Sequence, residues 1–184
     1  MLDLLDTEKH FILSHLVRGC TAVDFTMGNG NDTLFLSRSV GPEGKVYAFD
    51  IQEKALASTE RLLSEHNAPR NYTLIKDSHH RAKDYIKEGS FRVGMFNLGY
   101  LPGSDKSVTT LHETTLEAVK AASLLLEHSG CITVAVYPGH EEGAVEGRML
   151  EEMLSSYDRK SFCITGLRIV NSPSSPFIFL IEKK

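Results

Sequence analysis

The most informative segment of this 184-residue chain reads Thr21-Ala22-Val23-Asp24-Phe25-Thr26-Met27-Gly28-Asn29-Gly30-Asn31-Asp32. Its apolar first half is typical of a buried strand, here ending in an acid. The two glycines tolerate positive φ and let a ligand approach the backbone. Asn31 and Asp32 are good helix N-cap residues, and we expect a helix over residues 33–39. The segment therefore predicts a strand, a glycine turn and a helix start that presents free N–H groups.

The chemistry of this turn argues against a phosphate ligand. A pyrophosphate site would need a G-x-G-x-x-G run, and Thr33 stands at the position of the third glycine. The P-loop lysine is absent, and Asp24 at the strand end would repel phosphate. A carboxylate there suits a cationic ammonium instead, and S-adenosylmethionine (SAM) carries an ammonium and no phosphate. The alternative is an ordinary βα turn without a ligand.

Two further strands are predicted to end in polar residues. Lys45–Asp50 ends in an acid at about the distance from the glycine turn at which a βαβ unit places a carboxylate on ribose hydroxyls. Asp50 could also cap the next helix, and both roles are compatible. A third strand, Asn71–Lys76, ends at Asp77-Ser78-His79-His80. Such strand ends share one edge of a sheet, where open α/β folds bind ligands.

Composition narrows the class of protein. The formal charge of −4 does not indicate a broad nucleic-acid-binding face, although it allows a local patch. Arg81, Lys83, Lys87 and Arg92 form either such a patch or a solvated face. The three cysteines are far apart without a C-x-x-C motif, so we expect reduced thiols and no metal site. A signal peptide and a membrane-length apolar run are not evident, so a cytoplasmic protein without a membrane partner is expected.

Helix and strand patterns alternate along the rest of the chain. A leading helix over residues 4–18 takes its apolar face from Leu5, Phe11, Ile12, Leu13, Leu16 and Val17. Later helices are predicted over 53–66, 81–87, 108–128 and 142–156, and later strands over 91–97, 131–136, 162–169 and 177–182. The last two strands leave no room for a helix between them and should pair antiparallel. The pattern predicts one α/β domain over residues 1–184, with a leading helix in 1–19 and a doubly wound, Rossmann-like seven-stranded sheet in 20–184.

Two loops at strand ends hold the remaining candidate residues. The strand 91–97 runs into Asn97-Leu98-Gly99-Tyr100-Leu101-Pro102-Gly103-Ser104-Asp105-Lys106, a long glycine-rich loop of the kind that carries function. The strand 131–136 ends at Tyr137-Pro138-Gly139-His140. Structural roles are the alternatives. Asn97 and Gly99 could shape a turn, with Tyr100 in the core; Lys106 could be solvated, and His140 could cap a helix.

These blocks resemble one bacterial family of small class I SAM-dependent methyltransferases, long labelled rRNA methylases. The likeness rests on residues 24–33, 49–52, 96–103 with 105–106, and 137–140, and it covers nearly the whole chain. Members include the tRNA methyltransferase that converts 5-aminomethyl-2-thiouridine to its 5-methylaminomethyl form at the anticodon wobble position. Ser104 and Ser175 depart from the usual family residues. The resemblance implies the class I methyltransferase fold, with strand order 3-2-1-4-5-7-6 and the last strand antiparallel.

The resemblance also implies a site. The expected SAM contacts are Asp24, Thr26, Gly28, Asn29, Gly30, Asn31, Asp50, Gln52, Ser78, His79 and Asn97. The expected acceptor contacts are Leu98, Gly99, Tyr100, Leu101, Pro102, Gly103, Lys106, Tyr137 and His140. Asn97 and Tyr100 are the expected catalytic residues, because this loop looks like the Asn-Pro-Pro-Tyr loop of amino-methylating enzymes. In those enzymes the Asn oxygen holds the target amine and the aromatic ring stacks on the base.

The expected reaction is in-line methyl transfer to an amine, for which the protein mainly positions the reactants. The amine must be neutral, and Asn97 can accept its hydrogen bond without adding negative charge. A dedicated base is not required, and His79 or His140 is a candidate. The expected partner is the anticodon stem-loop of a tRNA, with a homodimer as one option. The alternatives are an rRNA or other RNA methylase, a small-molecule N-methyltransferase and a non-enzymatic SAM-binding module.

Overall fold

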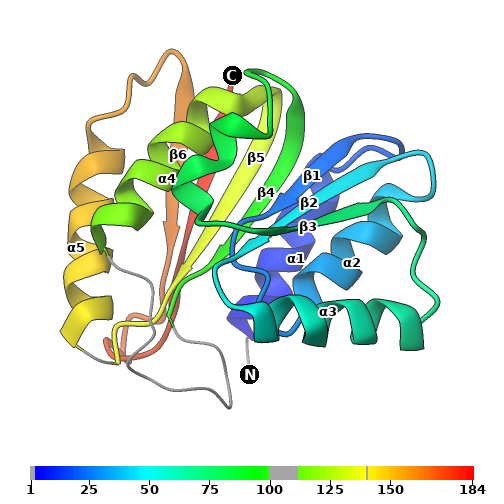
Figure 1. The fold of residues 1–184 in the computed structure, drawn as a ribbon. Helices are drawn as coiled ribbons and strands as arrows, with labels where there is room; N and C mark the ends of the chain where they lie inside the picture. Colours follow the sequence, from blue (N-terminus) through cyan, green and yellow to red (C-terminus); the bar gives the residue numbers. More distant parts are fainter. Residues whose placement is uncertain (1–2, 100–111, 140) are drawn as a thin grey trace.

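A mixed seven-stranded β-sheet runs through the middle of the molecule, in the order β3-β2-β1-β4-β5-β7-β6 (Figure 1). The structure, a computed structural model, describes residues 3–99, 112–139 and 141–184. The strands are β1 (Thr21–Asp24), β2 (Lys45–Asp50), β3 (Tyr72–Lys76), β4 (Phe91–Asn97), β5 (Leu126–Val136), β6 (Phe162–Leu167) and β7 (Phe177–Lys183). Strands β1 to β5 pair in parallel, and β7 pairs antiparallel with both β5 and β6. The predicted fold class and strand order are confirmed.

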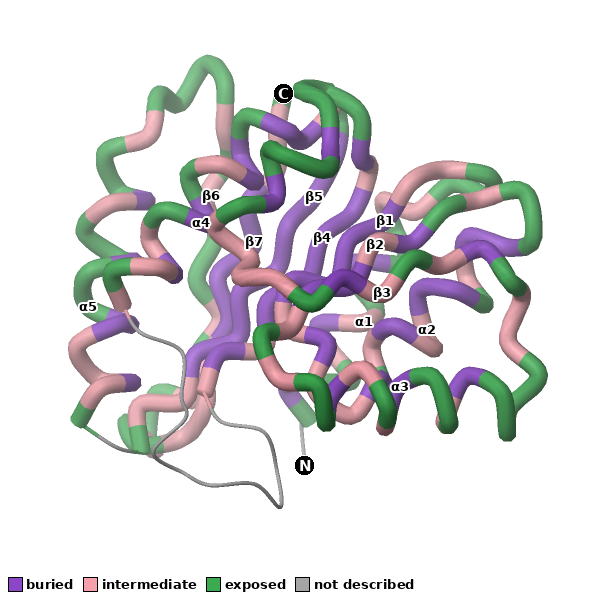
Figure 2. The backbone as a smooth tube through the Cα atoms, viewed as in Figure 1, coloured by how far each residue is buried: buried purple, intermediate pink, exposed green. Residues whose placement is uncertain are grey.

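Helices cover both faces of this sheet. They are α1 (Leu4–His15), α2 (Asn31–Val40), α3 (Glu53–Glu65), α4 (His112–Leu125) and α5 (Glu141–Ser155), with a short 3₁₀ helix η1 (His79–Asp84) after β3. One core cluster packs α4, α5 and η1 on one face, and a second packs α1 and α2 on the other. The central strands are buried almost throughout, as expected for parallel strands covered on both sides (Figure 2).

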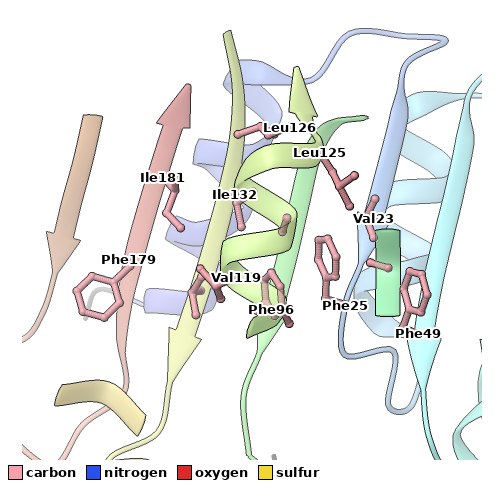
Figure 3. Packing of buried hydrophobic residues seen from close by; sticks show 14 of the residues in the cluster. Val23, Phe25, Phe49, Phe96, Val119, Leu125, Leu126, Ile132, Phe179 and Ile181 are labelled. Carbon is pink, nitrogen blue, oxygen red and sulfur yellow. The ribbon is translucent and has the colours of Figure 1, made fainter. Parts of the chain in front are cut away.

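Aromatic packing fixes the backbone where β1 enters the glycine turn. Phe25 stacks on Phe96 with ring centroids 4.2 Å apart and on Phe49 at 6.2 Å, so it bridges the strands on either side of β1 (Figure 3). Its ring is 1% exposed. Burying an aromatic ring this completely stabilises the fold by about 2–3 kcal/mol. The turn after Phe25 therefore starts from a fixed point.

The leading helix is shorter than predicted, and only part of the predicted apolar face is buried: Ile12 lies in the core, and Phe11 and Leu16 pack against it. It ends at His15, and its buried residues are Leu4, Glu8 and Ile12, one helical turn apart. The predicted core residues Leu5, Leu13 and Val17 are 38%, 49% and 55% exposed. The helix is packed through an ionisable residue, Glu8, whose carboxyl group accepts a hydrogen bond from Thr133 of β5. The pattern of apolar residues in the sequence could not predict that a glutamate would occupy a buried position of this helix.

The boundary between α4 and β5 also corrects the prediction. The helix ends at Leu125, and β5 begins at Leu126, whereas the apolar pattern predicts a helix to residue 128 and a strand only from 131. Leu126 pairs with Phe91 of β4, and a register shift follows before Val93 pairs with Cys131. Pairing with a distant strand overrides local helix preference here. Across the described ranges, the helices are too short or too polar to cross a membrane.

Candidate active site

The carboxyl ends of β1, β2 and β4 lie along one edge of the sheet (Figure 1), with the segment after β5 beside them. The sequence-predicted residues Asp24, Asp50, Asn97 and Tyr137 stand at or just after these strand ends. Parallel neighbours bring them together although they are far apart in the chain.

The glycine turn is shaped by left-handed backbone and by close packing. Gly28 has φ +53° and Gly30 has φ +86°. Gly30 is the N-cap of α2, which begins at Asn31, so the prediction that Asn31 or Asp32 caps this helix is wrong. A Cβ at Gly30 would lie 2.7–2.9 Å from side-chain and backbone atoms of Thr59. Only glycine satisfies both the conformation and the space at this position.

Asp24 supports the turn from below. Its carboxylate is 1% exposed and accepts hydrogen bonds from the Thr33 hydroxyl at 2.6 Å and the Thr26 N–H at 3.1 Å. Both oxygens of the Asp24 carboxylate therefore accept hydrogen bonds from residues in or just after the turn. The side chain can attract a bound cation through its charge more than through a direct contact.

Asp50 joins the ends of two strands. Its carboxylate accepts hydrogen bonds from the Gly28 N–H at 3.0 Å and the Gln52 N–H at 2.9 Å, and the side chain remains partly exposed. Gln52 is the N-cap of α3. Of the two predicted ribose-side residues, Asp50 thus bonds the glycine turn directly, and Gln52 bonds Asp50.

Three carboxyl groups surround this turn, and their electrostatics define the ligand that fits. Burial raises the pKa of Asp24, Asp32 and Asp50, and repulsion from Asp32 raises that of Asp24 further. A phosphate would meet the same repulsion. A ligand with a sulfonium and an ammonium would relieve it, so the residues present fit SAM and disfavour a nucleotide phosphate.

Ser78 and His79 follow β3, and His79 contacts Phe25 just after β1, where the glycine turn begins. The His79 Nδ1 lies 3.2 Å from the Phe25 carbonyl oxygen, which can only accept, so Nδ1 carries the proton. Burial lowers the pKa of His79 to about 4, and the imidazole is neutral. Ser78 contacts His80, with its hydroxyl 2.8 Å from Nδ1. On the turn itself, Asn29 accepts a hydrogen bond from Ser58 at 3.2 Å, and Asn31 is exposed.

Asn97 connects the turn to Tyr137. Its backbone N–H donates to the Thr26 hydroxyl at 2.6 Å, and its side-chain Nδ2 donates to Asp32 Oδ2. Its Oδ1 accepts from the Tyr137 hydroxyl at 3.2 Å. Burial raises the pKa of Tyr137 to about 12, so this hydroxyl keeps its proton at neutral pH. Both ends of the Asn97 carboxamide are therefore fixed by hydrogen bonds.

Two residues of this cluster were not expected from the sequence. Asp32 is predicted only as a helix cap, yet it bonds Asn97, 65 residues away. Lys9 of α1 lies with Nζ 3.9 Å from Asp32 Oδ1. The only sequence signal for this role of Asp32 is its position in the first turn of the helix that follows the glycine turn. Acids are common at this position because they interact favourably with the helix dipole, so the signal does not indicate a contact with Asn97.

The residues that were expected to contact the acceptor have different surroundings in the structure. The Leu98 side chain is 2% exposed and lies in the core, so an acceptor contact at this residue would have to come from its backbone. Gly99 has φ +128°, and among the described residues other than its chain neighbours no atom lies within 4 Å of where its Cβ would stand. The predictions for Tyr100, Leu101, Pro102, Gly103, Lys106 and His140 lie outside the described residues.

Two arginines of the predicted basic group are engaged in ion pairs. Arg81 pairs with Asp77 and Asp84 beside β3, whereas Arg92, near the start of β4, pairs with Glu127. Among the described residues, no cluster of His, Cys, Asp and Glu side chains is arranged to hold a metal ion.

Comparison with known proteins identifies the family. Residues 46–183 match the family model described as "Putative rRNA methylase". A chloroplastic tRNA (mnm(5)s(2)U34)-methyltransferase of Arabidopsis thaliana is 36% identical over 98% of this chain and 72% of its own length.

Two solved bacterial structures are similar over the whole chain. One, described as a putative rRNA methylase from Clostridium thermocellum, has a TM-score of 0.96 and 39% identity and covers 100% of this chain and 99% of its own. The other, a putative methyltransferase from Streptococcus mutans in complex with S-adenosylhomocysteine (SAH), has a TM-score of 0.89 and 35% identity with the same coverage. SAH is what remains of SAM after methyl transfer. This chain therefore belongs to the family described as rRNA methylases, a family of SAM-dependent methyltransferases.

Proposed function

We propose that the chain methylates tRNA, transferring a methyl group to the 5-aminomethyl nitrogen of (2-thio)uridine at the anticodon wobble position. The name of the A. thaliana relative supports this substrate. The observation that carries the proposal is the Asn97 carboxamide, fixed at the end of β4 with its oxygen on the Tyr137 side. An uncharged hydrogen-bond acceptor at this place suits an amine better than a hydroxyl or a carbon nucleophile.

The residues that would hold SAM are the glycine turn, Asp50 and the first residues of η1. When bound, SAM supplies a methyl group already activated on a sulfonium. Asp50 can accept hydrogen bonds from ribose hydroxyls while it holds the Gly28 N–H. The carboxyl groups of Asp24 and Asp32 favour the cationic end of the ligand.

Asn97 orients the acceptor in this proposal. Its Oδ1 accepts a hydrogen bond from the neutral amine, leaving the nitrogen lone pair free for the methyl group. The described groups around it do not offer a good base. Tyr137 is a donor, His79 has a pKa of about 4, and Asp32 is engaged with Asn97. The amine is therefore expected to lose its proton to solvent before transfer, and activity should rise with pH until the amine is neutral.

The experiment is nucleoside mass spectrometry of tRNA from a strain lacking this gene. Accumulated 5-aminomethyl-2-thiouridine, converted by the purified protein with SAM to the 5-methylaminomethyl form, supports the proposal. The family description makes rRNA the rival substrate, so rRNA from the same strain is assayed in parallel. Methylation of rRNA with unchanged tRNA nucleosides would overturn the tRNA assignment, and methylation of a free amine alone would favour a small-molecule enzyme.

A further inference from the structure

We infer that Asp32 is a positioning residue that determines which end of the Asn97 carboxamide faces the acceptor. This inference rests on the proposed function, because it concerns how the acceptor amine is oriented. Asp32 lies in the first turn of α2, and its side chain is 17% exposed. Asp32 and Asn97 are 65 residues apart in the sequence, so their contact arises only because the fold brings α2 and the end of β4 together.

The hydrogen-bond chemistry of the two neighbours allows one orientation. An ionised carboxylate only accepts, so Asp32 Oδ2 requires the Nδ2 end of the amide. The Tyr137 hydroxyl, held protonated, donates to the opposite end, Oδ1. A flipped amide would place its carbonyl oxygen against the carboxylate and its NH₂ group against the donating hydroxyl. Both contacts would then be unfavourable.

The groups around Asp32 keep it suited to this task. Lys9 and the Asn97 amide favour the carboxylate, whereas burial and the neighbouring charge of Asp24 oppose it. The N-terminus of α2 adds a positive partial charge next to the side chain. These contacts come from α1, α2 and β4, so the acid is held by three elements.

Orientation matters more for an amine than for most acceptors. With Oδ1 presented, the amide accepts an N–H and leaves the nitrogen lone pair exposed. With Nδ2 presented, the amide would donate to that lone pair and block the nucleophile. Loss of Asp32 should therefore reduce turnover without removing any atom that contacts the cofactor or the acceptor.

The test is a double-mutant cycle of Asp32→Leu and Asn97→Ala, measured by single-turnover methylation of undermodified tRNA. Asp32→Leu should lower kcat by about tenfold to a hundredfold, the range expected for misorientation near the reacting atoms. Asp32→Asn keeps an acceptor and should recover much of the loss. In the Asn97→Ala background, Asp32→Leu should have little further effect, because the two residues act as one unit. Affinity for SAH should fall only a fewfold in Asp32→Leu, through loss of a nearby negative charge, and by much less than the tenfold steps of the activity test.

A second readout does not depend on activity. In ¹⁵N spectra, the Asn97 side-chain NH₂ signal, identified by its loss in Asn97→Ala, should be shifted and protected from exchange in the wild type. Both properties should disappear in Asp32→Leu. Arg38→Leu, an exposed change at the other end of α2, is the control and should alter neither readout.

The outcomes separate the inference from the proposed function. Additive losses in the cycle, or a SAH affinity that falls in step with kcat, would overturn the inference by making Asp32 a general electrostatic or cofactor group. An unchanged Asn97 signal in Asp32→Leu would do the same. Wild-type protein that leaves the tRNA amine unmethylated would refute the proposed function instead, and the ¹⁵N result would still decide the orientation. If Asp32→Leu does not fold, Asp32→Ala, which also removes the acceptor, takes its place in the cycle.

Discussion

The two halves of the site are built from different chemical groups. On the β1–β2 side, a glycine turn is held by carboxylates that bind its backbone, with Asp24 bonded to Thr26 and Asp50 to Gly28. On the β4–β5 side, the polar chemistry comes from two side chains, Asn97 at the end of β4 and Tyr137 just after β5.

This difference teaches where each half is vulnerable. The turn is made of main-chain groups and charge, so one substitution should weaken ligand binding without removing the site. The acceptor half depends on individual side-chain atoms, so one substitution should remove its function while leaving cofactor binding intact. The following predictions test this contrast.

Asn97→Ala should have the largest effect. It removes the amide that positions the amine, and kcat should fall by about a hundredfold. SAM affinity should change only modestly, because the backbone N–H to Thr26 remains. Calorimetry and single-turnover methylation of undermodified tRNA give the two values. Loss of SAM binding with normal turnover at saturating SAM would reverse the assignment of the two halves.

Asp50→Ala should weaken SAM binding by about 1–3 kcal/mol, roughly tenfold to a hundredfold, through loss of a charge-assisted contact. Turnover at saturating SAM should be much less affected. Titration calorimetry in EDTA measures the affinity, and Glu53→Ala, an exposed acid three residues later, is the matched control. Equal affinity in wild type and Asp50→Ala would exclude Asp50 from the cofactor site.

Glu8→Gln should stabilise the fold at neutral pH. Burial raises the pKa of Glu8 from 4.5 to about 8, so the unfolded chain loses this proton at lower pH than the folded one. Stability contributed by this group is therefore greatest below about pH 4.5 and falls as pH rises to about 8. Glutamine can still accept the Thr133 hydrogen bond without a charge, and a gain of about 1–3 kcal/mol is expected at pH 7.

Urea denaturation from pH 4 to 9 tests this, with the exposed acid change Asp6→Asn as control. The wild type should lose more stability than Glu8→Gln between those limits, and the two stability curves should converge at the acid end. Parallel curves for the two proteins would show that Glu8 is ionised in the fold.

Tyr137→Phe should have the smallest effect. It removes one neutral hydrogen bond to Asn97 Oδ1, worth about 0.5–1.5 kcal/mol, so kcat should fall by about two- to tenfold. Because Tyr137 acts as a donor with a pKa of about 12, the pH dependence of kcat should keep its shape below about pH 10. A lost pH-dependent limb in Tyr137→Phe would instead make this residue a base.

Sequence reasoning reached the parts of the molecule that local pattern controls. The alternation of elements, the acid at the end of β2 and the glycine turn all follow from residues near one another. It missed Asp32, because a helix-capping acid and an amide-orienting acid look the same until β4 is placed beside α2. It also missed Glu8, since a charged residue in a buried helix face contradicts the usual pattern and is explained only by Thr133, 125 residues away.

The hydrogen bond between Thr26 and Asn97 has a consequence for protein engineering. At residue 97 the bond uses the backbone N–H, whereas at residue 26 it uses a side-chain hydroxyl. Any amino acid except proline can therefore replace Asn97 and keep this bond, but only serine can replace Thr26 with the same geometry. A library that varies position 97 would explore new acceptor groups on an unchanged backbone. A library that varies position 26 would mostly lose this bond between the turn and the end of β4.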